Sequence, residues 1–122
     1  MSRGLINGSD LEEAYAPLQK VKDTITAFSG GGQASATLLP ASISRVTTVA
    51  VANDSVKLPG TAGLIGLTVL VINATANSMN VYPQTGEAID NLGANAAKAV
   101  AGNKSCDFTC TGAGQWHAVL SA

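Results

Sequence analysis

The chain has 122 residues, which is enough for one domain with an additional arm. Charged residues make up only 12% of it and the formal net charge is −1, so it has no basic surplus to neutralise phosphates and is not expected to bind nucleic acid. A surface with so little charge suits a subunit that works within an assembly, because like molecules repel each other weakly.

The first quarter of the chain is expected to form an arm, a short helix and a Gly-rich joint, over residues 1–33. Ser9 begins a sequence with capping-box spacing, which favours a helical turn up to about residue 15. Pro17 would disrupt a longer helix but suits a first helical position, so a second helix is predicted over residues 17–28. Residues 30–32 are all glycine and are expected to be a flexible joint.

Apolar residues in this region recur at the spacing of a coiled-coil heptad. Such a stripe could pack on the chain's own β-domain or on symmetry-related copies, and the spacing alone does not decide between them. If copies associate through it, the oligomer-interface residues are Leu11, Leu18, Val21, Ile25 and Phe28.

Beyond the joint, short apolar stretches alternate with turn residues, and one β-module is predicted over residues 34–122. Strands of this length and spacing predict a mainly β fold, specifically a small antiparallel β-sandwich or jelly-roll-like barrel. Residues 67–73 are apolar on both faces and should form a central strand. Residues 97–110 should fold as a hairpin around a turn at residues 102 and 103.

The two cysteines lie in one predicted strand. Cys106, Phe108 and Cys110 alternate with Asp107 and Thr109, so the first three should point inward and the other two outward. Four residues of strand span about 13 Å, which is too far for a disulfide bond. Two buried free thiols are therefore expected.

No set of residues in the sequence indicates catalysis. His117 is the only histidine, Asp107 is the nearest carboxylate on a strand, and no serine is marked as an activated nucleophile. A metal site would need further Cys or His ligands. We therefore expect no enzyme activity, no cofactor and no metal. Tyr82 and Trp116 could stack on a sugar, although packing in the core or in an interface is favoured.

No membrane partner and no secretion are expected. Residues 1–10 lack the apolar core of a signal peptide. The longest apolar stretch, residues 64–72, is too short to span a bilayer and is interrupted by Gly66 and Thr68. The protein is expected to be made in a cytoplasm.

Five short elements follow one another in the second half of the chain. They are Leu58-Pro59, Val71-Ile72-Asn73, Val81-Tyr82-Pro83 with Gly86, Ile89, and Gly114 with Trp116-His117. In order and spacing they resemble a small β-module of tailed-bacteriophage virion proteins, which occurs in head decoration proteins, head-fibre proteins and some tail appendages. The resemblance covers roughly the last half of the chain.

The resemblance implies a capsid decoration (cement) protein that binds the outer surface of the assembled head and stabilises it. Its partners would be the major capsid protein and two further copies in a homotrimer, because capsids offer sites of threefold symmetry. It would be made in the bacterial cytoplasm and end on the virion. The alternative is a tail or head fibre module that recognises a host-surface glycan. The arm residues expected to contact the capsid are Arg3, Leu5, Ile6 and Tyr15.

Overall fold

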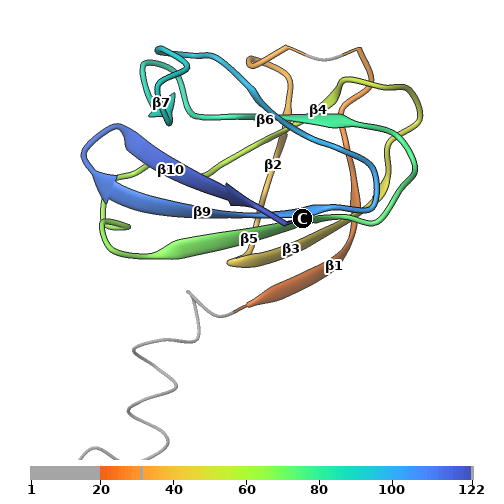
Figure 1. Cartoon of the computed structure of the whole chain (residues 1–122), viewed down its shortest axis with the longest axis horizontal. Coiled ribbons are helices and arrows are strands. Elements are labelled where there is room, and N and C mark those ends of the chain that lie inside the picture. Colours follow the sequence, from red (N-terminus) through yellow and green to blue (C-terminus); the bar gives the residue numbers. More distant parts are fainter. Residues whose placement is uncertain (1–19, 31, 122) are drawn as a thin grey trace, which may run out of the picture.

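The computed structural model describes residues 20–30 and 32–121. Within these ranges the chain forms ten β-strands in two sheets and no helix, so the prediction of a mainly β fold is confirmed. The two sheets lie one above the other as layers (Figure 1). No helix with the length and hydropathy to cross a bilayer occurs in the described ranges.

The larger sheet has six strands and the smaller has four. The spatial order in the larger sheet is β1 (Val21–Thr26), β3 (Ile43–Thr48), β5 (Thr68–Asn73), β9 (Ser105–Gly112), β10 (Gln115–Leu120) and β7 (Ala88–Ile89). The order in the smaller sheet is β2 (Thr37–Leu38), β4 (Asp54–Lys57), β6 (Met79–Tyr82) and β8 (Lys98–Val100).

From β1 to β6 the chain alternates between the two sheets. Each new strand lies beside the previous strand of its own sheet and runs parallel to it. This is a solenoid-like winding, in which every turn adds one strand to each sheet. The direction then reverses, since β8 and β9 run antiparallel to their neighbours and β9 forms a hairpin with β10.

The predicted antiparallel pairing is therefore wrong for most of the molecule. Five of the eight strand pairs are parallel, including all pairs among the first six strands. Parallel neighbours need a crossover connection, and here the crossover is a strand of the opposite sheet. Strand lengths and turn residues, which supported the antiparallel prediction, do not indicate which strand a given strand will pair with.

The helix predicted over residues 17–28 is also wrong in its described part, because residues 21–26 form β1. This segment is rich in β-branched side chains, which fit a strand better than a helix. β1 pairs with β3, and Phe28 exchanges two backbone hydrogen bonds with Ser55, of 2.8 and 3.0 Å. Residues 21–28 are thus bonded to both sheets. The helical turn predicted up to residue 15 lies outside the described residues.

The glycine joint is tied to the β-body at its first residue. Gly30 has a φ of 98°, a conformation that favours glycine, and its amide donates to Oδ1 of Asp54 at 3.2 Å. The other carboxylate oxygen of Asp54, Oδ2, accepts from the amide of Val51 at 3.2 Å. The buried carboxylate therefore connects the joint to the turn that precedes β4.

The core lies between the sheets and takes side chains from both. Its largest fully buried members are Trp116, Phe108, Leu58, Met79 and Ile89. β5 lies between β3 and β9, so its predicted central position is confirmed.

The predicted alternation along β9 is confirmed. Cys106, Phe108 and Cys110 are buried, Asp107 is exposed and Thr109 is half-buried. Both cysteines are free thiols, as expected. Burial is the main cause that raises the pKa of Cys106 from 9.0 to about 11.

The hairpin predicted over residues 97–110 does not form. β8 belongs to the smaller sheet and β9 to the larger one, so the connection between them passes from one sheet to the other. Gly102 makes this crossing possible, because a Cβ atom there would clash with the carbonyl of Ala76. The next amide, of Asn103, donates to the carbonyl of Thr75 at 2.8 Å.

Asn73 at the end of β5 holds the loops at this end of the molecule together. Its buried side-chain amide donates to the carbonyls of Asn77 and Val100, at 2.8 and 3.0 Å. Its Oδ1 accepts from the amide and the hydroxyl of Thr75, at 3.1 and 2.8 Å. One buried side chain thereby satisfies backbone groups of two loops that the strand ladders leave unpaired.

We predict that Gly102→Ala destabilises the protein by about 1–3 kcal/mol, because the added methyl group has no space against the backbone of Ala76. The matched control is Gly112→Ala, where a Cβ atom would meet open space. Urea unfolding measures both variants. Equal stabilities for the two would contradict the close packing of the two loops.

We also predict that both thiols react slowly in the native protein and rapidly after denaturation. The pKa of Cys106 lies near 11 in the folded state, so little thiolate forms at neutral pH. The folded state holds the Cys106 proton more tightly than the unfolded state does. The contribution of this proton to the free energy of unfolding is therefore complete below pH 9.0 and is lost as the pH rises through about 11. Thiol titration against pH measures this. Fast labelling of the folded protein at pH 7 would contradict it.

Candidate functional site

Five residues of the elements on which the expected resemblance rests lie in the interior of this fold. Leu58, Val71, Val81, Ile89 and Trp116 each have 0% of their surface exposed. These residues specify the architecture, because their side chains form the core between the sheets. A partner would have to be recognised by other residues, on the surface.

The predicted oligomer-interface residues do not form one stripe. Ile25 is buried in the core, whereas 63% of Val21 and 40% of Phe28 is exposed. A strand, unlike a helix, does not bring residues at heptad spacing to a common face. Leu11 and Leu18 lie outside the described residues, as do the predicted capsid contacts Arg3, Leu5, Ile6 and Tyr15.

The first turn of the winding has an open edge, which we call the open first turn and define as residues 21–28 with β2. β1 and β2 are edge strands of their sheets. The hydroxyl of Thr37 donates to the carbonyl of Thr26 at 2.8 Å and joins the two strands. Three large apolar side chains are exposed here, those of Val21, Phe28 and Leu38. Apolar side chains beside unpaired strand edges favour contact with another polypeptide.

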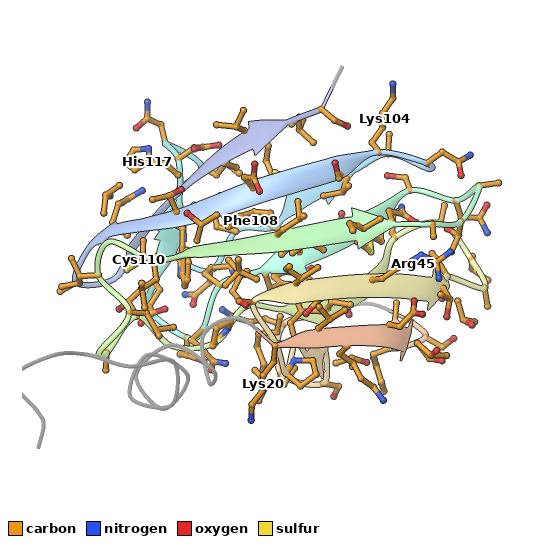
Figure 2. The ribbon with its side chains drawn as sticks, turned by 90° about the horizontal axis from the view of Figure 1, so that it is seen from below. Lys20, Arg45, Lys104, Phe108, Cys110 and His117 are labelled. Atoms are coloured by element: carbon orange, nitrogen blue, oxygen red, sulfur yellow. The ribbon has the colours of Figure 1, made fainter. Side chains whose placement is uncertain are left out.

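The other sheet edges are shorter. β7 has two residues and β8 has three, whereas β1 has six. Short edge strands offer few unpaired backbone groups, which limits pairing with other chains. β1 is therefore the strand edge best suited to continue into a partner. Arg45 of the neighbouring strand β3, labelled in Figure 2, forms an exposed ion pair of 2.8 Å with Asp23 of β1.

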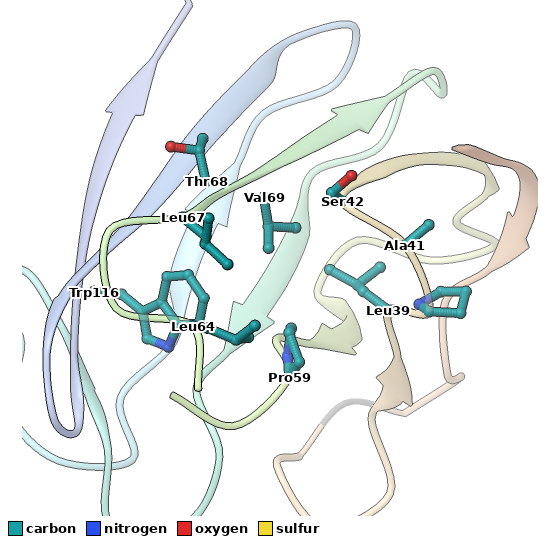
Figure 3. Close-up of a pocket in the computed structure, with 10 residues that line it drawn as sticks. Leu39, Ala41, Ser42, Pro59, Leu64, Leu67, Thr68, Val69 and Trp116 are labelled. Atoms are coloured by element: carbon teal, nitrogen blue, oxygen red, sulfur yellow. The ribbon is translucent and has the colours of Figure 1, made fainter. Parts of the chain in front are cut away.

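An apolar pocket of about 150 Å³ opens at the end of the molecule where two crossover connections pass (Figure 3). The connection from β2 to β3, the connection from β4 to β5, the start of β5, and β10 contribute its walls. The lining residues are Leu39, Pro40, Ala41, Ser42, Pro59, Leu64, Leu67, Thr68, Val69 and Trp116.

Two buried polar side-chain atoms of the described residues, one of them on the lining residue Trp116, lack hydrogen-bond partners. One is the indole nitrogen Nε1 of Trp116, a donor, and the other is Oε1 of Glu87, an acceptor. Glu87 is bonded to the loop between β4 and β5, because its Oε2 accepts from the amide and hydroxyl of Thr61, at 3.1 and 2.9 Å. Thr61 belongs to the loop that carries the lining residues Pro59 and Leu64. Unsatisfied buried groups of this kind indicate a place where a bound molecule or water can contribute.

His117 lies beside a carboxylate that sequence reasoning did not select. Its Nδ1 is 3.8 Å from Oδ1 of Asp90, and Lys98 contributes its Nζ at 3.4 Å from Oδ2. Asp90 reaches this position because β7 pairs in parallel with β10, a pairing that no local pattern indicates. Asp107, the carboxylate expected nearby, lies opposite Val119 instead.

Trp116 is fully buried, so its ring is not available to stack on an external sugar. Over the described ranges, no group of three or more His, Cys, Asp or Glu side chains could hold a metal ion.

No family model matches the chain, and neither a curated protein nor a solved structure matches it. The proposals below therefore depend on the surfaces described above and on the sequence resemblance.

Proposed function

We propose that the chain is a bacteriophage capsid decoration (cement) protein, which binds the outer surface of the assembled head and stabilises it. The open first turn is the observation that carries this proposal. It presents Val21, Phe28 and Leu38 to solvent beside the longest free strand edge of the described chain. A rigid β-body with such an edge is suited to binding a protein surface by adding strands and burying apolar side chains. The virion context comes from the sequence resemblance.

In this proposal the protein acts by binding and not by chemistry. A cement protein that binds the assembled shell but not its free subunits shifts the assembly equilibrium by mass action. At a concentration one hundred times its Kd, such binding adds about 2.7 kcal/mol per site. The major capsid protein is the partner that this mechanism requires, and the low surface charge reduces repulsion between neighbouring copies on the shell.

We propose further that the protein works as a homotrimer on sites of threefold symmetry. The open first turn replaces the heptad stripe as the contact between copies or with the shell, because the described part of that stripe is a strand. The fibre alternative, with recognition of a host glycan, receives less support, since Trp116 is enclosed in the core.

We predict that Val21→Ser combined with Leu38→Ser in the full chain weakens binding to undecorated phage heads at least tenfold. Both side chains are more than half exposed, so the fold should tolerate the change within about 0.5 kcal/mol. The matched control is Val119→Ser, which alters a similarly exposed valine (69%, against 63% for Val21) on β10 of the larger sheet. Co-sedimentation with heads measures occupancy. If the double variant bound as well as the control, the attachment surface would lie elsewhere.

We predict a mass near three times 12.2 kDa for the free protein at micromolar concentration, because the exposed apolar side chains of the open first turn become buried between copies. Light scattering coupled to size-exclusion chromatography measures it. A single species of monomer mass would contradict trimerisation of the free protein.

A further inference from the structure

We infer that Ile65 of one copy inserts into the apolar pocket of a neighbouring copy, so that the occupant of this pocket is a second copy of the chain. The inference deepens the proposed homotrimer and rests on it, because it names a contact between the copies. It follows from the way the loop between β4 and β5 presents Ile65, from the size and lining of the pocket, and from the continuity of the pocket with the open first turn.

Ile65 lies at the tip of a tight turn, and 61% of it is exposed. The amide of Leu67 donates to the carbonyl of Leu64 at 2.9 Å and closes this turn, in which Gly66 has a φ of 90°. The amide of Gly66 also donates to the carbonyl of Cys110 in β9, at 2.7 Å. The turn is therefore fixed to the larger sheet. Isoleucine is not one of the residues that such turns favour, so the turn itself does not account for an apolar side chain at its tip.

The start of the same loop is fixed as well. Thr61 is buried, and its amide and hydroxyl donate to Oε2 of Glu87 at 3.1 and 2.9 Å. The hydroxyl oxygen of Thr61 accepts from the amide of Gly114 at 2.9 Å. Both ends of residues 61–67 are thus bonded to other parts of the β-body. Because the backbone is already ordered, the insertion of Ile65 into a partner costs little further conformational entropy.

The pocket complements this side chain in size and chemistry. Its volume of about 150 Å³ is similar to that of an aliphatic cavity that binds benzene, so it can take one branched aliphatic group. Eight of the ten lining residues are apolar and none is charged. Residues 59–67, which carry Ile65, include no charged residue either, so the contact buries no unpaired charge. Figure 3 shows Leu64 and Leu67, the neighbours of Ile65 in this loop, at the wall of the pocket.

The continuity of the pocket with the open first turn assigns it to a second copy. Leu38 of β2 belongs to the open first turn and is exposed, and the next two residues, Leu39 and Pro40, line the pocket. The surface that we propose to be buried between copies therefore extends directly into the pocket. Ile65 and the pocket are different surfaces of one chain, so their contact is heterologous. Such a contact closes into a ring when the copies are related by a threefold axis, which is the symmetry of the proposed homotrimer.

The variant Ile65→Ser in the full chain tests this contact. We expect it to raise the protein concentration at which half of the trimer dissociates at least tenfold, because each copy loses an apolar side chain buried in its neighbour. The matched control is Val51→Ser, which alters a side chain of similar exposure (63%, against 61%) in the loop between β3 and β4. Light scattering over a dilution series measures the dissociation. Equal midpoints for the two variants would overturn the inference.

A second measurement uses the wild-type protein and needs no variant to fold. One sample is labelled on the isoleucine methyl groups and another on the alanine methyl groups, both in a deuterated background. The two are mixed at a dilution at which the trimer dissociates, and the mixture is then concentrated. Ala41 lines the pocket, so we expect nuclear Overhauser contacts between the methyl groups of Ile65 and Ala41, which in this mixture arise only between copies.

The outcomes separate this inference from the proposed function. A trimer that shows the contacts between Ile65 and Ala41 but does not bind undecorated heads supports the inference and contradicts the decoration function. A trimer without these contacts overturns the inference alone. A protein that stays monomeric at every concentration overturns both the inference and the proposed homotrimer. A shift of the Ala41 signal on binding to heads, without contacts between copies, would assign the pocket to the capsid protein and also overturn the inference.

Discussion

The whole structure depends on the burial of one core between two sheets that the chain builds in alternation. Each strand of the second and third turns must pair with the strand of the preceding turn and, at the same time, place its inward side chains against the opposite sheet. Val46, Val56, Val71 and Val81 come from four successive strands of the two sheets, and all have 0% of their surface exposed. Short β-branched side chains pack well in such layers, because they are stiff and fill the space between sheets without long flexible ends.

This way of building the core leaves the two ends of the molecule different. At one end the winding stops by reversing direction, and β8, β9 and β10 complete the sheets in antiparallel fashion. Asn73 and Gly102 allow the loops there to approach closely, through buried hydrogen bonds and the absence of a Cβ atom. At the other end the first turn has no preceding turn to pair with. Its exposed apolar side chains are a consequence of the architecture, and they form the surface to which we propose that a partner binds.

Interior and surface residues therefore have different roles: the first determine the architecture and the second determine what the protein can bind. Leu58, Val71, Val81, Ile89 and Trp116, which belong to the motifs on which the expected resemblance rests, are enclosed in the core, so these residues concern the way the β-module is built. Related architectures host unrelated partners, because recognition depends on surface side chains. The proposed decoration function draws on both: on the resemblance for the virion, and on the open first turn for the surface that binds.

The sequence by itself determined the features that depend on near neighbours. The inward side of β9, its two buried thiols and the central place of β5 follow from alternation and hydrophobicity within a few residues. Only the tertiary structure decided which strands pair. Val21, Ile25 and Phe28 fit a helical spacing, yet the backbone of this segment finds its partners in β3 and at Ser55 and becomes extended.

The same reason applies to the candidate sites. Asp90 reaches His117 through the pairing of β7 with β10, and Lys20 reaches the pocket rim through Ser42 and Ile43. Each of these contacts joins residues more than twenty positions apart. Whether these contacts form depends on the free energy of packing the entire core, and a local pattern of residues does not predict that free energy.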